Sequence, residues 1–319
     1  MAEKKYLRLK HFEVEGSNVL FLGQAPYLDL GSPFNASDPL QKKMLLDEGV
    51  VIEVRPVEKG QSSKESFLII EPHPDDFALS CSGFALSKLQ EGASLSLLNL
   101  FSGSSLSTFP WNQKVQITEE EYEALRLYES RTAAEYLDIP FKSYKLPLGL
   151  KRGHRTPFEK LREKDWNTVD RLAGNLTMEL KDGFSAVVAP CGIQDHVDHV
   201  VALEAVRFMK IVRQEAGSSL SLFLYEDMPY AENRVAYQKR MRELNQRFHL
   251  KPVYIPVGEH LEIMADLASV YRSQFDDVTR VQRLALMQDH ARTVAAEARS
   301  EGVKFQDEFA QRIFEAELK

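Results

Sequence analysis

Residues 66–77 read "SFLIIEPHPDDF" and contain the feature that decides the fold. The apolar, β-branched run at 66–70 predicts a buried central strand, and the following "FALSCSGFALSKLQEG" has the apolar spacing of a helix. A His and two adjacent Asp therefore lie on a strand-to-helix turn. Because ligands usually bind at such turns in open α/β sheets, this stretch predicts a site as well as a fold class.

Beyond this stretch, strand-like and helix-like segments alternate as they do in βαβ units. Further strands are predicted at 94–101, 143–148, 185–190 and 220–226, and helices are expected to begin near Asp76, Glu119, Phe158 and His199. Right-handed crossovers then give an α/β fold, with a doubly wound, mostly parallel, Rossmann-like sheet and helices on both faces. From Glu232 onward we expect a mainly helical chain, which could cover the sheet or pair with a neighbouring subunit in a homo-oligomer.

The N-terminal part has the pattern of a separate unit. The polar connector "EKGQSSKES" at 58–66 follows strand-like stretches at 18–23, 27–30 and 50–57 and a helix candidate at 38–49. We therefore predict a small α+β accessory module of unknown role over residues 1–60 and a main domain over 61–319.

Composition narrows the classes of protein. With 319 residues, of which 44% are hydrophobic, the chain can bury a full core. Its net charge of -7 is spread along the sequence and gives no reason to expect nucleic acid or an anionic membrane as partner. We expect a cytoplasmic protein without a membrane span, because no apolar leader follows the N-terminus. Cys81 and Cys191 are expected to pack as small hydrophobes.

A second polar cluster follows another predicted strand. The stretch "SAVVAPCGIQDHVDHVVALEAV" at 185–206 runs from a strand through a Pro/Gly loop into a helix. It carries His196 and His199, three residues apart and therefore on one helical face if the helix has begun at His196. Because the carboxyl ends of parallel strands meet at one edge of a sheet, we expect both clusters to converge there.

The residue types in the two clusters suit a catalytic metal. Two His and one carboxylate, with a fourth position for water, form the ligand set of a catalytic zinc site. The side chains of Asp75 and Asp76 leave the turn in different directions, so one can bind metal while the other acts as general base. Spacing alone leaves open which does which. Either Asp, taken alone, could instead cap the following helix.

The two clusters also resemble known signatures. "PHPDDF" at 72–77 resembles the His-Pro-Asp-Asp signature of the PIG-L/LmbE-like zinc-dependent de-N-acetylase family, and "HVDH" at 196–199 resembles its His-x-x-His signature. The similarity spans about residues 67–275 and includes "RLYESRTAAEYLDI" at 126–139. Members remove acetyl groups from N-acetylated amino sugars with a divalent metal. The resemblance implies that 61–319 is a metal-dependent deacetylase domain with one Zn and an N-acetylglucosamine-type substrate.

Carried over position by position, the resemblance implies that His73, Asp76 and His199 bind the metal. Asp75 is then the general base, and protonated His196 stabilises the oxyanion and helps to expel the amine. Substrate contacts are expected from Arg126, Gln194, Trp111 and Asp227.

The chain departs from the family pattern in places. Phe77 stands where most members have Glu, and Gln194 stands where some have an oxyanion-stabilising Tyr. The basic run "KRGHR" at 151–155 is expected to be a solvated loop. An alternative function is a non-catalytic member that binds a sugar or nucleotide-sugar. A nucleotide-dependent Rossmann enzyme is disfavoured, because the first turn carries carboxylates in place of glycines.

Overall fold

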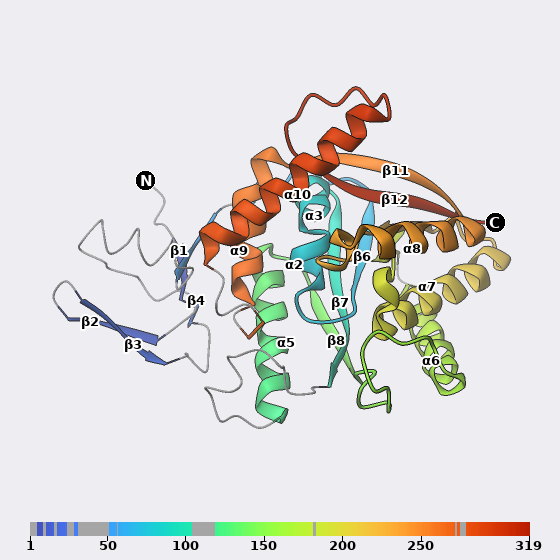
Figure 1. Ribbon diagram of the computed structural model, residues 1–319, viewed down its shortest axis with the longest axis horizontal. Helices are drawn as coiled ribbons and strands as arrows, with labels where there is room; N and C mark the ends of the chain where they lie inside the picture. Colours follow the sequence, from blue (N-terminus) through green and yellow to red (C-terminus); the bar gives the residue numbers. More distant parts are fainter. Residues whose placement is uncertain are drawn as a thin grey trace.

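The computed structural model describes residues 5–8, 11–15, 18–23, 29–30, 51–55, 57–103, 119–180, 183–271, 273–274 and 279–319. Its centre is a seven-stranded sheet in the order β11-β12-β10-β9-β6-β7-β8 (Figure 1). Five of these strands run parallel: β6 (Ser66–Glu71), β7 (Ser94–Gly103), β8 (Phe141–Pro147), β9 (Ala186–Pro190) and β10 (Ser221–Tyr225). The predicted α/β class with a mostly parallel sheet is confirmed.

Helices cover both faces of this sheet (Figure 1). One face carries α2 (Asp76–Ser80), α3 (Ser82–Gln90), α5 (Glu119–Tyr136), α9 (Leu261–Val270) and α10 (Arg280–Ser300). The other carries α6 (Glu163–Glu179), α7 (Val197–Glu215) and α8 (Arg234–Arg247). Strand β6 supplies both cores, since Phe67 and Ile69 pack on the first face while Leu68 and Ile70 pack on the second. Burial on both sides explains its continuous apolar run.

The strand order reverses beside β6. From β6 the chain moves outward through β7 to β8, then returns to place β9 on the other side of β6. In register, Phe67 of β6 lies opposite Leu95 of β7 and Ala186 of β9. The carboxyl ends of β6 and β9 are therefore neighbours at the topological switch point, where open α/β sheets bind their ligands.

The expectation of a mainly helical chain after Glu232 is only partly right. Helices α8, α9 and α10 are present, but β11 (Phe248–Pro256) and β12 (Ala310–Leu318) extend the sheet as an antiparallel pair. Strand β12 also pairs antiparallel with β10. Its sequence "AQRIFEAEL" contains several good helix formers. Pairing on both edges and burial of Ile313 and Phe314 outweigh that local preference.

The N-terminal strands form two further sheets. Strands β1 (Lys5–Arg8), β4 (Asp29–Leu30) and β5 (Val51–Val54) form one, and β2 (His11–Glu15) and β3 (Asn18–Gly23) form a hairpin. Directly after β5, the backbone N–H of Arg55 donates to the Tyr136 hydroxyl at 2.9 Å, and its Nε donates to Asp266 at 3.0 Å. The helix predicted at 38–49 lies outside the described residues, and the division at residue 60 stays a prediction.

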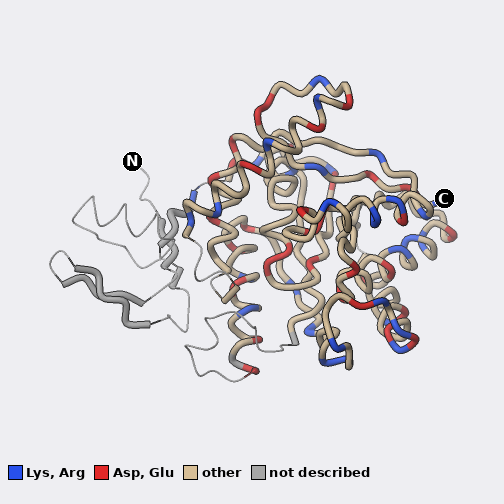
Figure 2. The backbone as a smooth tube through the Cα atoms, viewed as in Figure 1, with Lys and Arg blue, Asp and Glu red and all other residues tan. Residues whose placement is uncertain are grey.

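Charged residues are distributed along the chain, as the sequence indicated. Lys and Arg are interspersed with Asp and Glu along the described elements (Figure 2). None of the described helices is both long enough and apolar enough to cross a membrane. Cys81 and Cys191 are free thiols, fully buried as the sequence predicted.

Candidate metal centre

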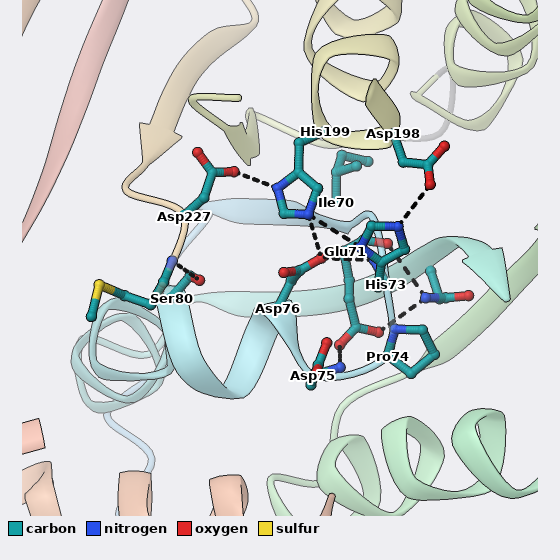
Figure 3. Close-up of polar contacts among 12 residues, drawn as sticks. Ile70, Glu71, His73, Pro74, Asp75, Asp76, Ser80, Asp198, His199 and Asp227 are labelled. Carbon is teal, nitrogen blue, oxygen red and sulfur yellow. Dashed lines mark hydrogen bonds and ion pairs between the residues drawn. The ribbon is translucent and has the colours of Figure 1, made fainter. Parts of the chain in front are cut away.

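Three acceptor atoms converge at the switch point (Figure 3). His73 lies on the turn after β6, Asp76 is the first residue of α2, and His199 lies in the first turn of α7. The Nδ1 of His73 is 3.1 Å from the Nε2 of His199, and the Oδ2 of Asp76 is 3.4 Å from the first and 3.3 Å from the second. Tetrahedral zinc with bonds of about 2.0–2.1 Å needs ligand atoms about 3.3 Å apart. The triangle therefore fits one metal ion.

Carboxylates fix the outward nitrogen of each imidazole (Figure 3). The Nε2 of His73 lies 3.0 Å from Oδ2 of Asp198, and the Nδ1 of His199 lies 2.6 Å from Oδ1 of Asp227. A carboxylate accepts the ring N–H on that side, so the inward nitrogen of each ring presents a lone pair to the triangle. Such carboxylate–imidazole pairs orient metal-binding His and raise their basicity.

Both supporting carboxylates are themselves held in place. Asp198 accepts from the guanidinium of Arg152 at 2.8 Å and from the backbone N–H of Gly149 at 3.2 Å. Asp227 accepts from the backbone N–H of Ile193 at 2.9 Å. The predicted solvated loop at 151–155 is therefore wrong for Arg152, whose side chain is largely buried against Asp198 and Asp165.

The electrostatics of the triangle favour positive charge. Burial opposes charge on His199, but Asp76 and Asp227 outweigh it and raise its pKa well above the usual value. Likewise, Asp198 and Asp76 overcome burial and raise the pKa of His73. Against the effect of its own burial, Asp76 has a pKa lowered by His199 and His73. The carboxylates that stabilise positive charge on His73 and His199 would also stabilise a bound metal cation.

His196 lies beside the triangle. One ligand atom each from His73, His196 and His199 fall within 4.8 Å of one another, so a site of three His is a second possible set. We favour Asp76 as the third ligand because its distances match a tetrahedral edge. The Nδ1 of His196 is buried and has no hydrogen-bond partner among the described residues, which leaves it available to a bound molecule.

The charge state of His196 differs from the expectation of a protonated imidazole. Burial, together with the neighbouring His199 and His73, lowers its pKa well below the usual value. This environment favours the neutral form of His196. A neutral imidazole can still donate one N–H to an oxyanion, but it has no spare proton for a leaving amine.

Asp75 lies on the other side of the turn in a strained conformation. Its φ of 122° falls in a region that non-glycine residues rarely adopt. The Oε1 of Glu71 accepts its backbone N–H at 3.2 Å, and the guanidinium of Arg126 lies 3.3 Å from its Oδ1 and donates to the carbonyl of Pro74. Burial raises the pKa of Asp75 to about 7, with Arg126 opposing the rise. A carboxyl with such a pKa suits proton transfer near neutral pH.

Glu71 is a buried support that sequence reasoning missed. Its carboxyl is fully buried and also accepts from the hydroxyl of Ser130 at 3.0 Å. Burial raises its pKa to about 8. Phe77, which departs from the signature that the resemblance implies, is fully buried in the core. Glu71, the last residue of β6, thus places a carboxyl where it accepts the backbone N–H of Asp75.

The predicted substrate contacts have mixed outcomes. Arg126 faces Asp75. Asp227 lies behind His199 with both oxygens engaged, so we reassign it from substrate contact to orienting that ring. Gln194, in η2 (Ile193–Asp195) just before His196, has a left-handed φ of 62° and is partly exposed. Trp111 lies outside the described residues.

Tyr230 is a further residue that the sequence did not single out. It opens η3 (Tyr230–Glu232), after β10, and its ring centroid lies 5.6 Å from those of both His196 and His199. Its only sequence signal was its place in "YEDMPYA", close behind a predicted strand end.

Comparisons with known proteins agree with this geometry. A family model described as GlcNAc-PI de-N-acetylase (PIG-L) matches residues 68–210, which include both clusters. The 2'-N-acetylparomamine deacetylase of Streptomyces fradiae is 31% identical over 218 residues, covering 66% of this chain and 74% of that protein.

Solved structures share the fold. The zinc-inhibited form of teicoplanin deacetylase matches with a TM-score of 0.62 at 20% identity, covering 80% of this chain and 98% of its own. The 4-carboxy-2-hydroxymuconate hydratase GalB of Pseudomonas putida KT2440 matches with a TM-score of 0.56 at 14% identity, covering 80% and 97%. Since a hydratase has the same fold, the reaction must be inferred from the site.

Proposed function

Because this chain belongs to the PIG-L/LmbE-like family of de-N-acetylases, we propose that it is a zinc-dependent hydrolase that removes the acetyl group from an N-acetylated amino sugar or a conjugate of one. The observation that carries the proposal is the triangle of His73, Asp76 and His199, with sides of 3.1–3.4 Å, beside the partly buried carboxyl of Asp75. The relative's named substrate, an acetylated paromamine, supports an amino-sugar substrate.

His73, Asp76 and His199 would hold the metal, and Asp198 and Asp227 would keep the two rings in position. When bound there, a divalent ion such as zinc lowers the pKa of water and polarises the acetyl carbonyl. Both ring N–H groups are accepted by carboxylates, so neither imidazole can turn away from the triangle without losing a buried hydrogen bond.

Asp75 moves the proton. As water attacks the acetyl carbon, Asp75 accepts a proton, a C–O bond forms, and the carbonyl π electrons move to oxygen. The neutral His196 donates an N–H to that oxygen. When the C–N bond breaks, its electron pair stays on nitrogen and Asp75 returns the proton there. Acetic acid, which ionises to acetate, and the free amine leave. We assign protonation of the amine to Asp75 rather than His196, because the surroundings of His196 lower its pKa and favour its neutral form.

Arg126 and Glu71 position the base. The charge of Arg126 lies 3.3 Å from Asp75 and stabilises its ionised form, while Glu71 holds its strained backbone. Left-handed backbone in a residue other than glycine costs on the order of 1–3 kcal/mol and persists only where neighbouring groups enforce it.

The proposal is tested by measuring acetate released from a panel of N-acetylglucosamine conjugates, with O-acetylated and N-propionylated versions as controls. We expect acetate from the N-acetyl compounds, together with one equivalent of free amine. Tight binding of the sugars with no acetate after zinc is added would contradict catalysis and support the non-catalytic alternative.

A further inference from the structure

Tyr230 stands on a loop that is tied to the metal-binding elements. The loop begins at Asp227, which bonds to His199, and the backbone N–H of Met228 donates to the Ser80 hydroxyl of α2 at 3.0 Å. The backbone N–H of Ala231 donates to the carbonyl of Asp227 at 2.9 Å. These bonds fix Tyr230 relative to α2 and α7, which carry two of the three proposed ligands.

The ring of Tyr230 is enclosed by other rings. Its centroid lies 5.6 Å from His196 at a tilt of 34° and 5.6 Å from His199 at 81°. Phe158 packs edge-on against it at 5.7 Å, and also against His196 at 5.5 Å. Contacts on several sides leave the ring little freedom, so the position of its hydroxyl is set before any molecule binds.

The hydroxyl of Tyr230 is exposed to the charges of the proposed site. The charges that act on it most strongly are those of Asp76, Asp75 and Asp227, followed by Arg126. Burial and these carboxylates raise the pKa of Tyr230, so it keeps its proton. Among the described residues, the hydroxyl donates no hydrogen bond. It is a donor without an acceptor.

We propose that Tyr230 is a catalytic residue whose hydroxyl donates a hydrogen bond to the acetyl carbonyl oxygen of the substrate as that oxygen gains negative charge. This inference rests on the proposed deacetylation. A carbonyl carbon attacked near Asp75 lies beside the metal triangle, and the ring of Tyr230 lies 5.6 Å from the rings of His196 and the ligand His199. With His196, whose ring lies 5.6 Å from its own, Tyr230 forms a pair of donors on one side of the site, as in an oxyanion hole. Gln194 is then not required as an oxyanion donor.

Tyr230→Phe tests this assignment because it removes the hydroxyl and retains the ring packing. We expect kcat for acetate release to fall about 100-fold, the usual effect of losing one oxyanion donor, with KM changed less than about threefold. Bound metal should stay at the level of the unaltered protein. Tyr254→Phe is the matched control, since Tyr254 donates to Glu301 on the surface, far along the chain from both clusters.

A second measurement does not depend on turnover. Acetate is a product of the proposed reaction, and one of its carboxyl oxygens derives from the acetyl carbonyl. If the Tyr230 hydroxyl donates to that oxygen, the affinity of the zinc-loaded protein for acetate, measured by calorimetry, should be at least about tenfold weaker in Tyr230→Phe. Unchanged kcat and unchanged acetate affinity would overturn the role of the hydroxyl. A rise in KM alone, or loss of metal, would also overturn it, by indicating ground-state binding or a structural role.

The two proposals fail in different ways. If the unaltered protein released no acetate from any N-acetylated sugar, deacetylation would be contradicted. The acetate affinities would still decide whether the Tyr230 hydroxyl contacts a carboxyl oxygen in the site.

Discussion

Two sides of one turn hold adjacent carboxylates in contrasting surroundings. On the ligand side, His199 and His73 lower the pKa of Asp76 against the effect of burial. On the base side, burial raises the pKa of Asp75 to about 7, and the charge of Arg126 only partly offsets it. Because their surroundings shift the pKa values of Asp75 and Asp76 in opposite directions, the two carboxyls can take different roles. One stays ionised and can bind metal, while the other can exchange a proton.

The backbone differs between the two sides as well. Asp76 begins helix α2, and its Oδ2 accepts the backbone N–H of His73 at 2.7 Å, an arrangement without strain. Asp75 is held at a φ of 122° by groups from β6 and α5. The backbone of Asp76 is therefore held by a contact within the turn, whereas the backbone beside Asp75 also depends on Arg126 of α5, which donates to the carbonyl of Pro74.

The largest effect is expected from breaking the ligand side. His199→Ala removes one corner of the triangle and leaves Asp227 without its buried partner, so we expect loss of bound metal and no detectable acetate release. Elemental analysis and the acetate assay would measure both. His249→Ala, an exposed His on β11, is the control and should match the unaltered protein. Full metal content in His199→Ala would remove this residue from the ligand set.

Breaking the base side should separate turnover from metal binding. Asp75→Asn keeps the shape of the side chain but cannot accept the proton, so kcat should fall about 1,000-fold with metal retained. Asp76→Asn, its neighbour, should lose metal. If Asp75→Asn lost metal and Asp76→Asn kept it, the two roles would be reversed.

A smaller effect is expected from weakening the support of a ligand. Asp227→Asn leaves an oxygen near His199 but removes the negative charge, so metal affinity should fall roughly 10–100-fold. Competition with a chromogenic chelator would measure it. Asp195→Asn provides the control, because Asp195 pairs with Lys239 at the surface. Equal affinities in the two variants would show that the Asp227 charge does not tune the site.

The smallest effect concerns the support of the base. Glu71→Ala leaves the partly buried N–H of Asp75 without its acceptor, and we expect kcat to fall roughly tenfold, about the value of one hydrogen bond. Glu71→Gln keeps an oxygen acceptor and should stay within about threefold. A larger loss in Glu71→Gln than in Glu71→Ala would show that Glu71 acts through its proton rather than by position.

The sequence predicted the strands and the convergence of the clusters for a clear reason. Strand β6 is buried on both faces, so its apolar run stands out, and parallel strands bring their carboxyl ends to one edge. Strand β12 was missed, because its Ala, Glu and Leu favour helix and only pairing with β10 and β11 makes it a strand.

The contacts around the clusters could not be predicted in the same way. Asp227 and Tyr230 reach the site because the loop after β10 bonds to η2 and α2, contacts between segments far apart in the sequence. In the sequence, Glu71 is only the last residue of a predicted strand. Its role in holding Asp75 becomes visible from the hydrogen bond that it accepts from the backbone N–H of Asp75. The pKa of His196 is lowered by its burial beside two other imidazoles, and the spacing of residues in the sequence does not predict that burial.

The most direct test of the central claim is acetate release before chelation, after chelation, and after zinc is restored, measured with the metal content at each stage. We predict about one zinc per chain at the start, loss of both metal and turnover on chelation, and recovery of both when zinc is returned. Acetate release that continues at full rate in metal-free protein would contradict a metal-dependent deacetylase at this site.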